Sequence, residues 1–306
     1  MTHARRSFLK ALPAAGFLAS CSKASKIRLA LNWKPDPEFG GFYAADYAKH
    51  GLDVEILPGG AGTPTVQMIG AGSAEFGIVA ADDTLVARSQ NNDVIALFAV
   101  FQSNPMGIMA HASRKLKSIG DVLQSGTVAM QSGLPYARLL KKKFSFDHVK
   151  VVPSTGGDLT AFLRDENFAQ QCFLMDEPLQ AKRRGVEVTV FPVSDVGYNP
   201  YTTVLAVSGN LLRKDPDMAK NMVAAVRDGW RIYLDNPGPT NEKMRALNPT
   251  IDAASYAETA VAQKVLIESN PLGKMSKERW DTLAAQLKDL GDIPTAPSAD
   301  QCFRDL

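Results

Sequence analysis

The sequence predicts an α/β protein of two lobes with a helical C-terminal region. Short apolar segments alternate with helical segments from Lys26 onward, a pattern typical of mostly parallel sheets covered by helices. The same alternation restarts after residue 113, and the chain reads as helical after Asp215. A second lobe inserted into a first one creates a cleft, so we expect functional residues in the loops that follow strands.

Residues 21–112 and 202–306 are predicted to form the first lobe. Its expected strands are the apolar runs at 27–33, 52–57, 76–80, 94–101 and 202–207. Its first helices are expected at 40–50, 63–71 and 84–90. Thr63 is the expected N-cap of the second of these helices, with Pro64 at the favoured first position. Trp230, Tyr233 and Leu234 share one face of a C-terminal helix, which predicts that they lie in the core.

Residues 113–201 are predicted to form the second lobe. The expected strands lie at 127–130, 149–152, 172–175 and 186–191. Helices are expected at 118–123, 135–144, 159–165 and 178–184. The two crossovers between the lobes are expected near 112–118 and 195–201, where the pattern restarts and where Gly and Pro mark the return of the chain.

Residues 1–20 are predicted to be an export signal. Arg5 and Arg6 precede a short apolar stretch that contains Pro13 and is too short to span a bilayer. The Leu-Ala-Ser-Cys tetrad that ends at Cys21 resembles a bacterial lipobox. We therefore expect Cys21 to be lipidated and to anchor an exported protein to the membrane.

Charge and cysteine usage argue against several classes of protein. The leader contains three of the 34 basic residues and none of the 32 acidic ones, so the rest of the chain carries 31 against 32 and a net charge of −1. This balance gives no sign of a nucleic-acid-binding surface. Cys172 and Cys302 have no metal or redox spacing and are expected to be free, and the four histidines form no metal-binding motif. We expect no metal and no cofactor.

Loops after the first-lobe strands carry candidate ligand groups. Asn32 and Trp33 end the first strand and suit the stacking of a flat ring and hydrogen bonding to its edge, although a tryptophan here could equally be core. The glycine-rich loop at Gly60 could receive a polar group on free amides, or could be a plain tight turn. Asp83 follows the third strand, where an aspartate commonly caps a helix.

The second lobe repeats this arrangement of strand, small residues and helix at Ser132 and Gly157. Glu177 follows an apolar strand and could accept hydrogen bonds from the ring nitrogen and amine of a ligand, or could lie at a solvated helix start. Tyr198 and Asn199 lie where the chain returns to the first lobe and could line the cleft.

Several segments together resemble the periplasmic-binding-protein family of the sulfonate and thiamine-pyrimidine precursor type. They lie at 32–37, 41–45, 51–54, 59–60, 74–78, 176–178 and 197–201. The resemblance covers most of residues 26 to 235 and implies a type II periplasmic binding protein, whose two α/β lobes close on a ligand. It implies an exported component of an ABC importer, partnered by permease and ATPase subunits. The Asn32-Trp33 opening is most similar to the branch that binds aminopyrimidine thiamine precursors.

The same family contains fungal enzymes that build the thiamine pyrimidine, so a synthase-like enzyme is an alternative. In those enzymes a lysine carries pyridoxal phosphate, a histidine is consumed and a cysteine-rich run binds iron. The resemblance places these groups at Val79, at Asp83 and at 198–202, and a second family histidine at Phe39. None of these residue types is retained, so we expect no enzymatic activity.

We therefore predict a monomeric, lipid-anchored solute-binding protein that sandwiches a flat heteroaromatic ligand, an aminopyrimidine, between its lobes. Riboflavin is the alternative that needs the same stacking in a larger slot, and a sulfonate or nitrate comes third. A lipid-anchored partner of a sensor is an alternative role, and it would differ from a transport protein only in the protein that it contacts. The residues expected to contact the ligand are Asn32, Trp33, Phe39, Tyr43, Gly60, Asp83, Gln102, Ser132, Gly157, Glu177, Tyr198 and Asn199.

Overall fold

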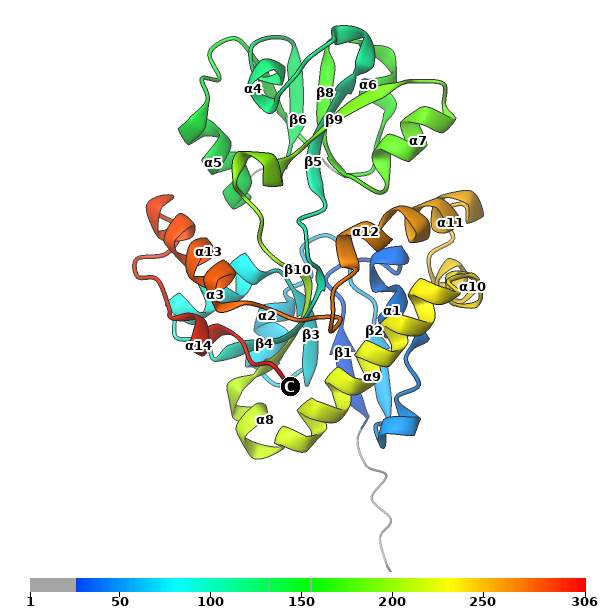
Figure 1. Cartoon of the computed structure of the whole chain (residues 1–306), viewed down its shortest axis with the longest axis vertical. Helices are drawn as coiled ribbons and strands as arrows, with labels where there is room; N and C mark the ends of the chain where they lie inside the picture. The colour runs from blue at the N-terminus through cyan, green and yellow to red at the C-terminus, as the bar shows by residue number, and fades with distance from the viewer. Residues whose placement is uncertain (1–25, 132, 155) are drawn as a thin grey trace, which may run out of the picture.

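The computed structural model describes residues 26–131, 133–154 and 156–306, and these residues form two lobes joined by two crossovers (Figure 1). Each lobe is built on one five-stranded sheet flanked by helices. The predicted α/β class, with a helical C-terminal region, is confirmed. The expected leader, Cys21 and Ser132 lie outside the described residues.

The first sheet has the strand order β2-β1-β3-β10-β4. The first three of these strands run parallel, whereas β10 returns from the second lobe and pairs antiparallel with both β3 and β4. The edge strand β4 is covered by the C-terminal segment, because Arg304 donates its N–H to the Ala96 carbonyl at 2.9 Å. The strands are β1 Ile27–Ala30, β2 Val54–Leu57, β3 Phe76–Val79, β4 Val94–Phe101 and β10 Thr202–Ser208.

The second sheet has the strand order β7-β6-β8-β5-β9. β6 pairs parallel with β7 and β8, and β5 pairs antiparallel with β8 and β9. The strands are β5 Met106–His111, β6 Thr127–Met130, β7 Lys150–Pro153, β8 Phe168–Phe173 and β9 Val188–Pro192.

The boundary between the lobes differs from the sequence-based expectation at one point. Met106–His111 is an inner strand of the second sheet, so the second lobe begins before residue 113. The first crossover is therefore 102–105 and not 112–118. A short apolar run does not indicate which of two sheets it joins, and here antiparallel pairing with two neighbours places it in the second. The second crossover, at 197–201, lies inside the expected range.

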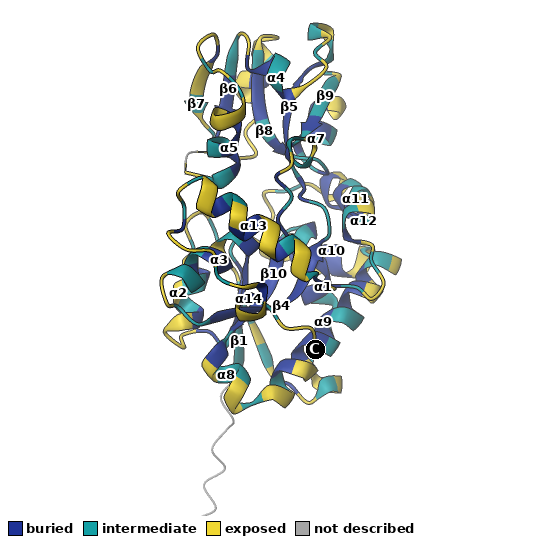
Figure 2. Ribbon diagram, turned by 60° about the vertical axis from the view of Figure 1, so that its left-hand side comes forward, coloured by how far each residue is buried: buried dark blue, intermediate teal, exposed yellow. Residues whose placement is uncertain are grey.

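Helices pack against both sheets, with exposed residues on their outer faces (Figure 2). Those that follow first-lobe strands are α1 Gly40–Ala44, α2 Thr65–Gly70, α3 Ala81–Ser89 and α8 Gly209–Lys214. The second lobe contains α4 Ile119–Val122, α5 Pro135–Lys143, α6 Thr160–Arg164 and α7 Glu177–Arg183. The C-terminal region contains α9 Pro216–Asp235, α10 Gly238–Leu247, α11 Ala253–Ala262, α12 Lys264–Ile267, α13 Lys277–Asp289 and α14 Ala299–Cys302.

Several helix starts differ from the predicted ones. The segment expected as one helix at 40–50 is α1 followed by a 3-10 turn at Ala48–His50. α2 begins at Thr65, and the Thr63 hydroxyl instead accepts the Gly60 N–H at 2.8 Å. α3 begins at Ala81, three residues earlier than expected, which places Asp83 in its first turn.

The predicted core position of Trp230 and Tyr233 on α9 is confirmed, because their side chains are fully buried. Their rings lie edge to face, with centroids 5.7 Å apart. α1 approaches α9 so closely that a Cβ added to Gly41 would lie 2.2 Å from the Trp230 ring. This contact fixes the loop after β1, which leads to the cleft.

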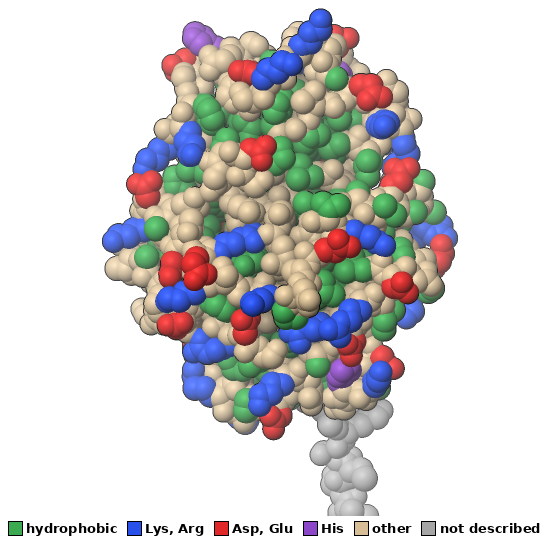
Figure 3. All heavy atoms as spheres, viewed as in Figure 1, with side chains coloured by type: hydrophobic (Ala, Val, Ile, Leu, Met, Phe, Trp, Pro, Cys, Tyr) green, Lys and Arg blue, Asp and Glu red, His purple; other side chains and the backbone are tan. Residues whose placement is uncertain are grey.

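The described residues contain no helix that is long and apolar enough to cross a membrane. Cys172 and Cys302 are both free and buried, as expected. On the face shown in Figure 3, acidic and basic side chains are interspersed over both lobes.

We predict that Trp230→Ala lowers the free energy of unfolding by about 3–5 kcal/mol, because it leaves a large cavity between α9 and α1. Ile232→Ala is the matched control on the same helix, since Ile232 is 52% exposed. Urea denaturation followed by circular dichroism measures both changes. Equal effects of the two substitutions would contradict the packing described for α9.

Candidate functional site

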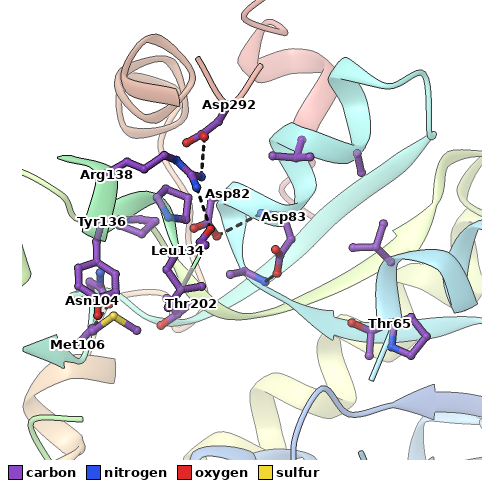
Figure 4. A pocket seen from close by; sticks show the side chains of 18 of the residues that line it. Thr65, Asp82, Asp83, Asn104, Met106, Leu134, Tyr136, Arg138, Thr202 and Asp292 are labelled. Carbon is purple, nitrogen blue, oxygen red and sulfur yellow. Dashed lines mark hydrogen bonds and ion pairs between the residues drawn. The ribbon is translucent and has the colours of Figure 1, made fainter. Parts of the chain in front are cut away.

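A cavity of about 540 Å³ lies between the two lobes (Figure 4). The first lobe contributes the starts of α2 and α3, and the second lobe contributes β5 and the start of α5. Asn104 of the first crossover and Tyr198 and Pro200 of the second also line the cavity. The cavity is therefore formed jointly by the lobes, and any motion of one lobe relative to the other changes its shape.

Two adjacent carboxyl groups, Asp82 and Asp83, lie at the start of α3 and line the cavity (Figure 4). Asp83 accepts the Ala80 N–H at 3.1 Å, so it caps the helix while remaining exposed to the cleft. Asp82 accepts the Tyr198 hydroxyl at 2.8 Å. Partial desolvation by the cleft walls, and then the neighbouring Asp82, raise the pKa of Asp83 to about 7. Desolvation also raises the pKa of Asp82.

One guanidinium lies beside these carboxyl groups. Arg138 on α5 lies 2.5 Å from Asp292, whose side chain is 10% exposed and which follows α13 in the C-terminal region. The ion pair therefore connects the second lobe to the C-terminal region across the cavity wall. The Thr202 hydroxyl also lines the cavity and is buried without a hydrogen-bond partner. The described lining thus contains three carboxyl groups and one guanidinium, which is already paired with one of them.

Glu177 lies buried at the start of α7, at the end of β8. Its Oε2 accepts the Phe173 N–H at 2.7 Å and its Oε1 accepts the Gly157 N–H at 3.3 Å. These bonds tie the end of β8 to the turn at Gly157, a glycine with a φ of 69°. Burial, and then the charge of Asp176, raise the pKa of Glu177 to about 7.

Three further carboxyl groups line a small cavity of about 40 Å³ between the lobes: Asp36 and Glu38 of the first lobe and Asp176 of the second. Asp36 accepts the Glu38 N–H at 2.9 Å, and Glu38 accepts the Thr203 hydroxyl at 3.3 Å. Burial is the main reason that all three pKa values are raised, to about 7 for Glu38. Among the described residues, none of the three forms an ion pair with a basic side chain. Like charges therefore face one another across the lobe interface.

The predicted ligand residues Asn32, Trp33 and Tyr43 line neither the large nor the small cavity. Trp33 is 37% exposed, so its indole is accessible. Its carbonyl accepts the Gly59 N–H at 3.0 Å, which holds the glycine-rich loop against the end of β1. The Asn32 Oδ1 and the Tyr43 hydroxyl are buried without partners. Burial, and then the charge of Asp36, raise the pKa of Tyr43 to about 12.

Phe39 is not in the cleft. It ends a 3-10 turn that directs its ring into the core of the first lobe, where it is fully buried. Gly60 uses its N–H to bind Thr63, so this amide is not free for a ligand.

Gln102 and Asn199 hold the crossovers and do not line the large cavity. Gln102 donates its side-chain amide to the Ala99 carbonyl at 3.0 Å. The Asn199 Oδ1 accepts the Asn104 N–H at 2.8 Å, which joins one crossover to the other. The structure thus brings Asp83 and Tyr198 together in the large cavity, and Glu177 and Gly157 together at the second-lobe side.

Several residues of the cleft were not predicted from the sequence. Asp82 directly precedes the predicted site residue Asp83, and this adjacency is the sequence feature that could have identified it. Arg138 and Asp292 are far apart in the sequence and are brought together by the fold. Neither lies in a segment whose pattern indicates a site. Arg279 contacts both crossovers from the C-terminal region, where no local pattern indicates a function.

The family model described as "NMT1/THI5 like" matches residues 36–239, which is more than half of the chain. The chain belongs to this family. The match includes both crossovers and the whole second lobe of this NMT1/THI5-like protein, and it begins after Asn32 and Trp33.

Two curated relatives span most of the NMT1/THI5-like chain. A riboflavin-binding protein, RibY, of Chloroflexus aurantiacus is 25% identical over 91% of this chain and 84% of its own length. A formylaminopyrimidine-binding protein of Halalkalibacterium halodurans is 21% identical over 89% of each chain. A 4-amino-5-hydroxymethyl-2-methylpyrimidine phosphate synthase of Legionella pneumophila is 24% identical, but over only 35% of each chain.

Solved structures of periplasmic binding proteins share the fold of this NMT1/THI5-like protein. The periplasmic aliphatic sulphonate binding protein SsuA of Escherichia coli matches with a TM-score of 0.69 and 13% identity, over 92% of each chain. A putative sulfonate-binding protein SsuA of Methylobacillus flagellatus matches with a TM-score of 0.65 and 15% identity, again over 92% of each chain. The predicted periplasmic-binding-protein fold is confirmed.

We predict that the free energy of unfolding falls as the pH rises from 5 to 8. The pKa of Glu177 is about 4.5 when unfolded and about 7 when folded, so folding takes up a proton in this interval. The stabilisation is complete below the unfolded pKa and is lost as the pH rises through 7. Urea titrations across this range should show a loss of about 1–3 kcal/mol from Glu177. Glu177→Gln should reduce this pH dependence, whereas the exposed Glu187→Gln should leave it unchanged; identical slopes for both variants would refute the assignment.

Proposed function

We propose that this NMT1/THI5-like protein is the solute-binding component of an ABC importer, with permease and ATPase subunits as its partners. The observation that carries the proposal is the cavity of about 540 Å³ that both lobes and both crossovers form together. A cavity of this kind can bury a small molecule when two lobes close. The two relatives that span most of the chain are named as binding proteins for small heterocycles, which supports the same assignment.

The charge of the cleft supports a neutral or cationic ligand that donates hydrogen bonds. The large cavity contains Asp82, Asp83 and Asp292, and its one guanidinium, on Arg138, is already paired. An anion placed there would face like charges in a partly desolvated site and would find no unpaired cation among the described lining residues. A sulfonate or nitrate is therefore disfavoured, although the fold is shared with sulfonate-binding proteins.

An aminopyrimidine fits this chemistry. Its exocyclic amine donates and its ring nitrogen accepts, so a carboxyl group that holds or releases a proton near neutral pH can pair with both sites. Glu177 and Asp83 are such groups, each with a pKa near 7; Asp83 lines the large cavity, whereas Glu177 lies outside its lining. We assign stacking to Trp33 and Tyr43, and further contacts to Asn32, Ser132, Gly157 and Tyr198. Of these, Ser132 lies outside the described residues.

Riboflavin is the second candidate, favoured by the relative of 25% identity and by the size of the cavity. It is also a flat heteroaromatic and would use the same stacking residue. Its isoalloxazine ring carries fewer amine donors than an aminopyrimidine, so it should depend less on Glu177.

The chain acts by binding and release, without a cofactor or a chemical step. Val79 and Asp83 stand at positions that resemble those of the lysine and histidine of the fungal enzymes, and neither supplies that chemistry. We further propose that the protein is a monomer, exported and anchored to the membrane through lipidated Cys21, which lies outside the described residues. Its cleft would then face the permease outside the cytoplasm.

We predict that Glu177→Ala weakens aminopyrimidine binding by about 1.5–3 kcal/mol, or roughly ten- to a hundredfold in Kd. The substitution removes the carboxyl group that would pair with the amine and the ring nitrogen of the ligand. In a desolvated site, water does not replace that pairing. Trp33→Ala should weaken aminopyrimidine and riboflavin to similar extents, because stacking discriminates little between flat rings. Isothermal titration calorimetry with both compounds measures the two effects.

Glu187→Ala is the matched control, since Glu187 is exposed on the same lobe. Urea denaturation of Glu177→Ala checks that the loss of its bonds to Phe173 and Gly157 has not unfolded the second lobe. If folded Glu177→Ala bound aminopyrimidine as tightly as the parent, Glu177 would be only a structural bracket and riboflavin would become the better candidate.

A further inference from the structure

Arg279, in the first turn of α13, binds both crossovers. Its Nε donates to the Asn199 carbonyl at 2.9 Å, and its Nη2 donates to the Asn199 Oδ1 at 3.0 Å and to the Pro200 carbonyl at 3.3 Å. Its Nη1 donates to the carbonyl of Gln102 in the other crossover. The guanidinium also lies over the Tyr201 ring, 3.9 Å from its centroid. One side chain thus fixes the two segments about which the lobes would move.

The Arg279 contacts reach the large cavity. Asn199, which Arg279 holds at two atoms, also accepts the N–H of Asn104, a cavity-lining residue. Tyr198 precedes Asn199 and donates its hydroxyl to Asp82 in the same cavity. Because Arg279 itself is not among the lining residues, it acts on the cavity through the crossovers.

The far end of α13 contacts the second lobe. Asp289, the last residue of the helix, lies 2.5 Å from Lys142 on α5. Asp292, just beyond it, pairs with Arg138 on the same helix α5. Between the two ends, Gln286 donates to the Gly197 carbonyl of the second crossover at 2.7 Å. α13 therefore extends alongside the crossovers toward the second lobe. In Figure 1 it lies between α3 of the first lobe and α5 of the second.

α13 is itself held firmly on the first lobe. Its buried face is formed by Trp280, Leu283, Ala284 and Leu287. Trp280 stacks on Phe303, with ring centroids 5.7 Å apart and planes 8° apart. The helix can therefore act as a fixed support that belongs to one lobe and holds the other.

We propose that α13 positions the second lobe over the cleft: Arg279 fixes the crossovers, and Asp289 and Asp292 hold α5. Opening of the lobes would separate α5 from α13 and break both ion pairs, and it would shift the crossovers from the arrangement in which Arg279 holds them. Arg279 is thus a positioning residue for ligand capture. The pairs with Lys142 and Arg138 are closure contacts whose strength depends on ionic strength.

The test uses the full ligand-free protein, so its outcome does not depend on which ligand the cleft takes. Small-angle X-ray scattering at low ionic strength gives the radius of gyration of the parent and of Lys142→Glu, which places two carboxylates in contact at the end of α13. We expect a larger radius for this variant, and recovery of the parent radius when Asp289→Lys is added. Raising the salt to about 1 M, where the Debye length is near 3 Å, should enlarge the parent in the same direction.

Lys141→Glu is the matched control. It changes the charge by the same amount on the same helix, and Lys141 has no ion pair among the described residues. Arg279→Lys keeps the charge but cannot bridge both crossovers, so it should also enlarge the radius. A urea midpoint that Lys142→Glu leaves unchanged would show that the lobes have moved without unfolding. An equal radius for the parent, Lys142→Glu and Arg279→Lys would overturn the proposal.

Discussion

The structure depends on one topological constraint: the two crossovers leave and enter neighbouring strands in both sheets. β4 and β10 are paired in the first sheet, with Thr202 opposite Phe101, and β5 and β9 are paired in the second, with Gly107 opposite Pro192. Two connections that start and end side by side form a narrow hinge, and they leave the lobes free to move about it. The loops after the strands of each sheet then face the other lobe, which is why the candidate ligand groups collect there.

Carboxyl groups dominate the electrostatics of this cleft. Asp36 and Glu38 come from one lobe and Asp176 and Glu177 from the other, and burial raises the pKa of each. Protons held at these raised pKa values neutralise part of the charge, and we expect closure of the lobes to become less favourable as the pH rises. A ligand that donates hydrogen bonds or carries positive charge replaces those protons. Glu177 of this group carries the predicted pH dependence of stability, and the proposed preference for an amine-bearing heterocycle rests on Glu177 together with Asp82 and Asp83 of the large cavity.

Local patterns predicted much of the fold and part of the site. The strand at 127–130 and the core position of Trp230 followed from hydrophobic pattern alone. Asp83 was found because it follows a strand. Other features depend on long-range packing that no local window contains: the sheet that Met106–His111 joins, the pairing of Arg138 with Asp292, and the hold of Arg279 on the crossovers. Phe39 was misplaced because its prediction rested on the position of a family histidine, whereas the 3-10 turn directs its ring into the core.

The most direct test of the central claim is a thermal-shift comparison of the purified protein with an aminopyrimidine, riboflavin, an alkanesulfonate and nitrate, each in large excess. A ligand that binds the native state alone raises Tm, and the stabilisation grows with the logarithm of its concentration relative to Kd. The carboxyl groups of the cleft predict a clear rise with the aminopyrimidine, a smaller or equal rise with riboflavin, and none with the two anions. A rise with the alkanesulfonate and none with either heterocycle would contradict the account.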